Sequence, residues 1–172
     1  MIYLELEEYF EFIFDDIREL AYDDKAKPYY ENEEAGLNQL SSILAFIQNS
    51  TLYPNFFSKA AFLFVVLSTG HKFSNGNKRL ALFSYIYFSN RNEVRYRRRQ
   101  IKTYEKWFDQ HFPKYVLSPH EFNSNVGWAL FNFNRCINVR ETEKNDGHNY
   151  NFDNLKEIAE KFFEFISAKK LD

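Results

Sequence analysis

Apolar residues recur along this sequence at intervals of three and four, which is the spacing of one face of an α-helix. The pattern is present in five segments, at residues 6–20, 37–47, 55–68, 77–88 and 153–166. Turn-forming residues are scarce, with five glycines and four prolines among 172 residues, and a β-sandwich or β-barrel needs more of them. We therefore predict an all-α fold, a compact bundle of six or seven helices.

The length is typical of one globular domain, so residues 1–172 are predicted to form a single unit. Residues 55–68 are apolar nearly all round, and this helix and the next are expected at the centre of the bundle. The stretch Thr69–Gly76 between them, with a glycine near each end, is predicted to be a loop. Further loops are predicted at Asp23–Gly36 and Glu141–Asn151.

The last third of the chain carries a helix-start signal at Ser118-Pro119-His120-Glu121, where serine serves as the N-cap and proline as the first helical residue. The helix that follows is expected to direct Val126, Ala129, Leu130 and Phe133 inward. Six phenylalanines are predicted to be core or near-core residues: Phe10, Phe12, Phe62, Phe64, Phe131 and Phe133.

Composition excludes several classes of protein. A hydrophobic content of 45% excludes intrinsic disorder. The longest apolar run, Ala60–Leu67, is far shorter than the ~20 residues of a membrane span, and no signal-peptide pattern opens the chain. The single cysteine, Cys136, allows neither an internal disulfide nor a zinc site of four cysteines. We expect a cytoplasmic protein with no membrane partner.

Charge is distributed unevenly along the chain. Residues 1–35 hold twelve acidic and three basic side chains, whereas residues 71–106 hold ten basic and two acidic ones. The densest basic stretch is Arg95-Tyr96-Arg97-Arg98-Arg99. It is either a solvated face balanced by the acidic N-terminal segment, or a surface for an anionic partner such as a nucleic acid, a nucleotide phosphate or an acidic protein.

The segment 71–79 carries the residues best suited to chemistry: His71-Lys72-Phe73-Ser74-Asn75-Gly76-Asn77-Lys78-Arg79. Gly76 permits close approach of a ligand to the backbone. Residues 77–79 would form the first turn of a helix, whose unpaired N–H groups and positive dipole end attract anions. Lys78 and Arg79 add positive charge, and His71 is placed to act as a general base. Structural roles are predicted for the other three histidines, His111, His120 and His148.

This segment resembles the signature of the Fic/Doc family, whose general form is HxFx[DE]GNGRxxR. The Doc-like branch, the death-on-curing toxins, has the form HxFxDxNKR, and Lys78 matches its lysine. The surrounding order of Gly36-Leu37, Leu52-Tyr53-Pro54, Lys59-Ala60-Ala61 and Arg79-Leu80-Ala81-Leu82 is also similar to that of Doc. The resemblance extends from the N-terminal helix to about Val94. Residues from about 100 to 172 match the family poorly.

The resemblance implies an all-α Fic-like fold with its active-site loop between two central helices. His71 would accept the proton of a hydroxyl on a protein target, and Phe73 would anchor the loop in the core. Gly76, Asn77, Lys78 and Arg79 would bind nucleotide phosphates. In typical Fic enzymes AMP is transferred, whereas the Doc-type lysine is associated with transfer of the terminal phosphoryl group of ATP. The target in Doc is a translation elongation factor.

Asn75 departs from the family, which has an acidic residue there to bind Mg²⁺, and an amide oxygen is a poorer ligand for this ion. Several functions therefore stay open: a Doc-like phosphotransferase using ATP and Mg²⁺, an AMP-transferring enzyme, a catalytically silent Fic-fold binding module, and a nucleic-acid-binding protein using Arg95–Lys106. The inhibitory pattern [ST]xxxE[GN] of many Fic proteins is absent, so the resemblance implies restraint by an antitoxin partner chain.

Overall fold

A computed structural model describes residues 1–20, 27–113, 115–120, 122–142 and 151–168, with side chains described throughout these ranges except at 139–142. Within these ranges the chain is mainly helical and forms no strand longer than a single antiparallel bridge, between Tyr96 and Ser167. The predicted all-α bundle is therefore confirmed. In the same ranges no helix is both long enough and apolar enough to span a membrane.

The first helical stretch is continuous and has three parts: α1 (Leu6–Glu8), a π-helical turn η1 (Tyr9–Ile13) and α2 (Phe14–Leu20). A short 3₁₀ turn, η2 (Tyr30–Asn32), precedes α3 (Glu34–Phe46). The remaining helices are α4 (Phe56–Thr69), α5 (Asn77–Arg91), α6 (Ile101–His111), α7 (Asn125–Thr142) and α8 (Phe152–Ile166). Counting the first stretch once, the described residues form seven helices, within the predicted range.

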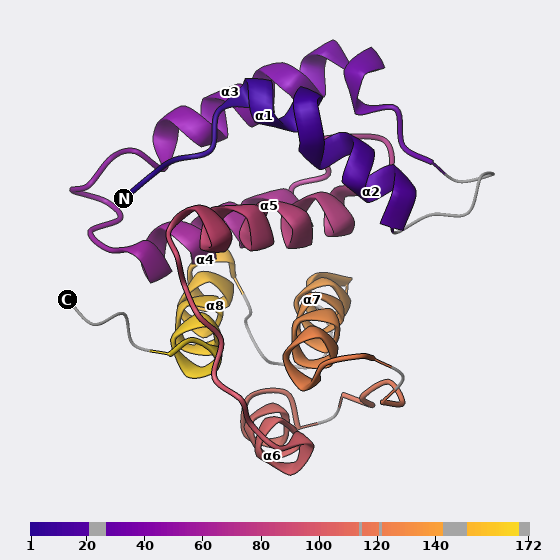
Figure 1. The fold of residues 1–172 in the computed structure, drawn as a ribbon, viewed down its shortest axis with the longest axis vertical. Coiled ribbons are helices and arrows are strands. Elements are labelled where there is room, and N and C mark those ends of the chain that lie inside the picture. Colours follow the sequence, from indigo (N-terminus) through magenta and orange to yellow (C-terminus); the bar gives the residue numbers. More distant parts are fainter. Residues whose placement is uncertain (21–26, 114, 121, 143–150, 169–172) are drawn as a thin grey trace.

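The helices are arranged in layers around α4 and α5 (Figure 1). The N-terminal helices α1, α2 and α3 cover one side of this central pair, and α7 and α8 cover the other, with α6 beyond them. Helix α4 packs most extensively against α5 and α8, as expected for a segment that is apolar nearly all round. Its start is fixed by Asn55, whose side chain accepts a hydrogen bond of 2.9 Å from the backbone N–H of Ser58.

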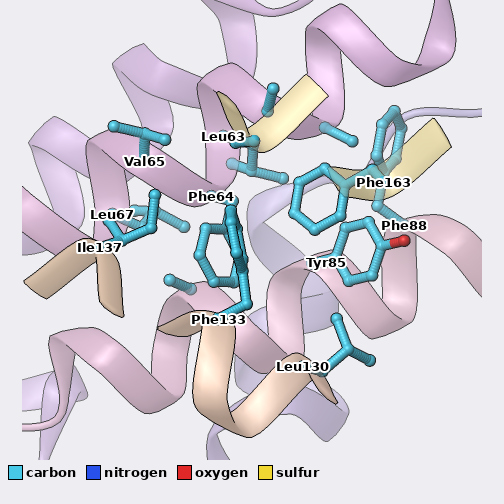
Figure 2. Packing of buried hydrophobic residues seen from close by; sticks show 14 of the residues in the cluster. Leu63, Phe64, Val65, Leu67, Tyr85, Phe88, Leu130, Phe133, Ile137 and Phe163 are labelled. Carbon is cyan, nitrogen blue, oxygen red and sulfur yellow. The ribbon is translucent and has the colours of Figure 1, made fainter. Parts of the chain in front are cut away.

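Aromatic rings fill the interface between the central helices and the C-terminal ones (Figure 2). Tyr85 of α5 stacks on Phe163 of α8 with ring centroids 3.9 Å apart, and Phe163 also meets Phe64 of α4 edge-on at 5.4 Å. Phe133 of α7 stacks on Phe162 at 4.0 Å. Stacked and edge-to-face pairs of this kind add to the stabilisation that burial of the rings provides. The core thus holds α7 and α8 firmly against α4 and α5.

The predictions for the phenylalanines are only partly correct. Phe62, Phe64 and Phe133 are buried, but Phe10 is 42% and Phe12 51% exposed. The π-helical turn explains the error at Phe10, because an i→i+5 turn holds more residues than an α-turn and shifts the buried face. Tyr9, Ile13, Phe14 and Ile17 are buried there instead. Phe131, at 36% exposure, was also predicted to be near-core, and it lines a cavity described below.

The predicted helix start at Ser118 is wrong, because α7 begins only at Asn125. The backbone of Ser118 is bound by side chains of α7 itself. Ser118 N donates to Asn132 Oδ1 at 2.9 Å, and Trp128 Nε1 donates to Ser118 O at 2.9 Å. The segment therefore lies against α7 and does not lead straight into it. The predicted inward residues Ala129, Leu130 and Phe133 are nevertheless buried.

Two other boundaries differ from the predictions. Helix α3 starts at Glu34, inside the predicted loop Asp23–Gly36, and α7 runs to Thr142, inside the predicted loop Glu141–Asn151. Residues 23–26 and 143–150 of these two predicted loops lie outside the described residues. Helix α6 was not predicted, although its buried residues Tyr104, Trp107 and Phe108 have helical spacing.

Candidate active site

The segment 70–76 connects the two central helices through a tight, constrained turn. Gly70 caps α4, and α5 begins at Asn77. Two residues of the turn have left-handed backbone conformations, His71 with φ 43° and Gly76 with φ 81°. Glycine adopts this region without penalty, whereas histidine does so at a cost of about 1–2 kcal/mol. Backbone strain of this kind is concentrated at functional sites, and here it falls on the predicted base.

The N-terminal layer braces the turn from one side. Tyr30 Oη donates to the backbone carbonyl of Gly76 at 3.0 Å, and its ring lies edge-on to Phe73 at 5.0 Å. Glu33 accepts hydrogen bonds from both the backbone N–H and the hydroxyl of Ser74, each at 2.7 Å. Phe73 is 3% exposed and packs so closely on Gly36 of α3 that a Cβ atom at residue 36 would lie 2.5 Å from its ring.

Sequence reasoning did not find these supporting residues. Tyr30 and Glu33 fall in a stretch predicted to be a loop, and no periodicity marks either of them as a neighbour of residues 71–79. Their contacts with the turn join residues more than forty positions apart in the chain, Glu33 with Ser74 and Tyr30 with Gly76. The adjacent Tyr29-Tyr30 pair was the one visible signal, and it does not indicate which ring is buried. Tyr30 is buried and Tyr29 is exposed.

A cavity of about 690 Å³ opens beside this turn, in the size range of small-molecule sites. It brings together most of the predicted site residues, because its lining includes His71, Asn75, Gly76, Asn77, Lys78 and Arg79. His71, Lys78 and Arg79 are exposed, so their polar groups are accessible to a ligand. Phe73 is buried behind the turn and does not line the cavity. The first turn of α5 therefore presents two cations and its N-terminal backbone to the same space as the imidazole.

Helix α7 forms a further wall of the cavity and was not predicted to do so. Asn134 and Arg135 line it, together with Phe131 one turn earlier. Asn134 Nδ2 donates to the carbonyl of Lys78 at 2.7 Å, and its Oδ1 accepts from the hydroxyl of Ser68 at 3.1 Å. Asn138 Nδ2 donates to the same hydroxyl at 2.6 Å. This buried network fixes the first turn of α5 to α7 and α4.

Asn75 is held in a local contact. Its Oδ1 accepts a hydrogen bond of 2.7 Å from the backbone N–H of Gly76. The nearby carboxylate of Glu33 uses both oxygens for Ser74. Among the described residues, no three histidine, cysteine or acidic side chains gather in a group that would hold a metal ion. The site residues therefore do not fit an Mg²⁺ ion held by the protein alone, because this ion prefers carboxylate ligands.

The arginine-rich stretch lies away from the cavity. It follows the C-terminal end of α5, whereas the cavity is lined by residues of the N-terminal half of this helix, and none of the residues Arg95–Arg99 lines it. Arg99 lies over the ring of Phe165 at 4.3 Å, and Tyr96 packs near Tyr85 with centroids 6.5 Å apart. Of the five residues Arg95–Arg99, Arg95 and Arg98 are the exposed ones. Tyr96 is partly buried and packs against the hydrophobic core.

The other described histidines have local structural contacts. His111 stacks on Trp107 at 4.0 Å, and its Nδ1 is 2.9 Å from the backbone carbonyl of the same residue. His120 Nε2 is 3.1 Å from Asn125 Oδ1. Neither lines the cavity. These contacts agree with the structural role predicted for both residues, and His148 lies outside the described residues.

The fold and the site together define an all-α protein with a cavity at the start of a central helix, lined by the imidazole of His71 and the cations Lys78 and Arg79. Residues 5–89 match the model of the Fic/DOC family. The matched residues, just under half of the chain, include the whole of segment 71–79 and end within α5. Members of this family are generally transferases that modify proteins. Searches of curated proteins and of solved structures found no match. Helices α6, α7 and α8 lie beyond the matched residues.

Proposed function

We propose that this protein is a Fic/Doc-type transferase that moves a phosphoryl group from ATP to a hydroxyl group of a protein target. The observation that carries the proposal is the meeting of three groups at one cavity. The strained and exposed His71, the cations Lys78 and Arg79, and the N-terminus of α5 all face it. A base beside an anion site is the minimum arrangement for transferring a group from a nucleotide to an alcohol.

In this reaction His71 accepts the proton of the target hydroxyl as its oxygen forms a bond to the γ-phosphorus of ATP. The bond between that phosphorus and the β,γ-bridging oxygen breaks, and ADP leaves. Lys78 and Arg79 neutralise the charge of the phosphates, and Arg79 can bind two phosphate oxygens at once. Backbone N–H groups at the start of α5 add fixed partial positive charge. ATP brings the Mg²⁺ that it binds in solution.

Two alternatives share this cavity. Transfer of AMP would use the same base but break the bond between the α- and β-phosphates and release pyrophosphate. Lys78 favours phosphoryl transfer, because the resemblance associates this lysine with the Doc-like branch. A catalytically silent binding module is favoured by Asn75, whose amide replaces a carboxylate and accepts a hydrogen bond from Gly76. A silent module would still bind nucleotide.

The distinguishing experiment incubates the purified chain and a cell lysate with ATP labelled at either the γ- or the α-phosphorus. Label on protein from the γ position alone supports the proposal, and label from the α position indicates AMP transfer. The variant His71→Ala is expected to abolish transfer. His120→Ala is the matched control, because His120 is exposed and outside the cavity. Absence of label from both positions with the wild-type chain would contradict the proposed transferase function.

We also propose that a partner chain restrains the activity, as an antitoxin does in the Doc-like branch, and that the modified target is a translation factor. The absence of the pattern [ST]xxxE[GN] from the sequence supports restraint by a partner chain. The resemblance of Lys78 to the lysine of the Doc-like branch supports a translation factor as the target. Expression of the wild-type chain in bacteria is then expected to arrest growth and protein synthesis. Expression of His71→Ala at the same protein level should not arrest growth or protein synthesis. Equal toxicity of the two chains would show that growth arrest does not depend on the proposed chemistry.

A further inference from the structure

Helix α7 contributes the side chains of Phe131 and Arg135 to the cavity, and neither has a role in the proposed reaction. The family match ends at residue 89, whereas Phe131 and Arg135 lie one helical turn apart on α7 and both line the cavity. Residues four apart on a helix share a face. The cavity is therefore closed on this side by an aromatic ring and a guanidinium group that belong to the unmatched part of the chain.

Among the described residues, the guanidinium group of Arg135 contacts rings and a hydroxyl group but no carboxylate. It lies over the rings of Tyr115 and Phe131, at 5.8 and 5.7 Å from their centroids, and donates to the hydroxyl of Ser118. Within the described ranges Arg135 makes no ion pair. Rings and a hydroxyl orient this group but leave its charge uncompensated. Arg135 is exposed, so that charge is available to an anion in the cavity.

The cavity also has an apolar part. It is lined by Leu20 of α2, Leu82 and Phe83 of α5, and Phe131 of α7. Phe131 contacts the ring of Phe122 at 5.1 Å and keeps 36% of its surface exposed. An apolar part beside a cationic part suits a ligand with a flat aromatic ring and an anionic tail. A nucleotide has this chemistry, because its base stacks on aromatic side chains and its phosphates pair with arginine.

We propose that α7 supplies a second nucleotide-binding wall, in which Arg135 binds the polyphosphate opposite Lys78 and Arg79, and Phe131 stacks on the base. This inference rests on the proposed function, because it assigns the ligand of the same cavity. It adds a third protein cation to a site whose residues do not fit a metal ion held by the protein. Asn134 supports the arrangement, since its hydrogen bond to the carbonyl of Lys78 fixes α7 relative to the start of α5.

The test measures binding of ATP and of inorganic tripolyphosphate to the full chain by calorimetry. Tripolyphosphate carries the anionic tail without the base, so it separates the two roles. Arg135→Ala is expected to lower the affinity for both ligands by about tenfold or more, because a charge-assisted hydrogen bond is lost. Phe131→Ala is expected to lower the affinity for ATP by about tenfold and to leave the affinity for tripolyphosphate unchanged. Because every base has a stacking face, GTP should respond to Phe131→Ala as ATP does.

Matched controls come from exposed residues that do not line the cavity. Arg98→Ala removes an exposed arginine and Phe152→Ala an exposed phenylalanine, and both should bind ATP as the wild-type chain does. Thermal unfolding of each variant checks that it is folded. If Arg135→Ala fails to fold, Arg135→Lys replaces it. Lysine keeps the charge but loses the planar fork, so weaker binding of both ligands is again expected.

The outcomes separate this inference from the proposed function. Binding of ATP that is unchanged by Arg135→Ala and Phe131→Ala but weakened by Arg79→Ala would overturn the wall on α7 and leave the proposed function intact. Failure of the wild-type chain to bind either ligand would overturn both. Loss of tripolyphosphate binding in Phe131→Ala would contradict the role given to the ring, because a stacking residue has no contact with that ligand.

Discussion

The side-chain amide of Asn77 is hydrogen-bonded to the backbone of Phe73 on both sides. Asn77 Oδ1 accepts from the N–H of Phe73 at 2.9 Å, and Asn77 Nδ2 donates to the carbonyl of Phe73 at 2.6 Å. Both residues are buried. Asn77 therefore holds the turn that carries His71 against the first turn of α5. Both polar atoms of its side chain are bonded to the turn.

Replacement of Asn77 by alanine should lower the free energy of unfolding by about 1–3 kcal/mol, because two buried backbone groups lose their partners. Asn77→Asp should also be destabilising, since a carboxylate cannot donate to the carbonyl of Phe73. Urea unfolding measures both effects. Asn90→Ala is the matched control, because Asn90 is an exposed residue of the same helix. Equal stability of Asn77→Ala and the wild-type chain would contradict the bracing role.

Gly36 is expected to tolerate no side chain. In Gly36→Ala the new Cβ would lie 2.5 Å from the ring of Phe73 and 2.8 Å from the backbone carbonyl of Lys72. A backbone atom cannot move aside as a side chain can, so we expect a lower melting temperature and weaker ATP binding. Gly127→Ala is the control. Its Cβ would meet only the hydroxyl of Ser124, at 2.9 Å, which accepts a hydrogen bond from the N–H of Gly127. This side-chain atom can rotate away, so we expect a smaller loss of stability than in Gly36→Ala and no change in ATP binding.

Gly76 provides the left-handed residue directly before α5. Gly76→Ala should cost about 1–2 kcal/mol, because a Cβ atom is disfavoured at φ 81°. Gly76→Asn should cost less, since asparagine adopts this region more readily than alanine. The order of stability in urea is therefore expected to be wild type, Gly76→Asn, Gly76→Ala. A reversed order of the two variants would show that space, and not backbone conformation, limits this position.

Asn134 connects α7 to the site. Asn134→Ala should lower stability by about 1–3 kcal/mol, because the carbonyl of Lys78 and the hydroxyl of Ser68 each lose a partner. ATP binding should weaken as well, since the first turn of α5 would no longer be fixed. To separate this effect on the site from a general loss of stability, ATP binding is measured at a temperature where Asn134→Ala and the wild-type chain are both fully folded. Unchanged affinity there would limit Asn134 to a structural role.

Alkaline pH should destabilise the protein through two partly buried tyrosines, Tyr87 and Tyr115. Burial, together with a hydrogen bond to Asp16, raises the pKa of Tyr87 from 10.0 to about 12, and burial raises the pKa of Tyr115 to about 12. The folded state therefore keeps these protons while the unfolded state loses them. Their contribution to stability is complete below pH 10 and is lost as the pH rises towards 12.

Urea unfolding at several pH values between 9 and 12 measures this loss. Tyr87→Phe should make the decline with pH less steep, although it lowers stability at pH 9 by removing the bond to Asp16. Tyr29→Phe is the control, because Tyr29 is exposed. A free energy of unfolding that does not fall between pH 10 and pH 12 would contradict the assignment.

The helices were largely predictable because their signal is local. Apolar spacing placed α3, α4, α5 and α8, whose buried residues recur within a few positions along the chain. The spacing failed at Phe10, which lies inside a π-helical turn where Tyr9 is buried instead. The helix-start signal failed at Ser118, where side chains of α7 bind the backbone and hold it outside the helix.

The sequence by itself determined the helical class of this protein and singled out the segment 71–79, to which the proposed chemistry is assigned, since each depends on residues close together in the chain. Only the tertiary structure decided what surrounds that segment. Tyr30, Glu33 and Gly36 reach it from one side and Asn134 and Arg135 from the other, across separations of about forty to sixty residues. Such contacts follow from how the helices pack, and no local spacing encodes them.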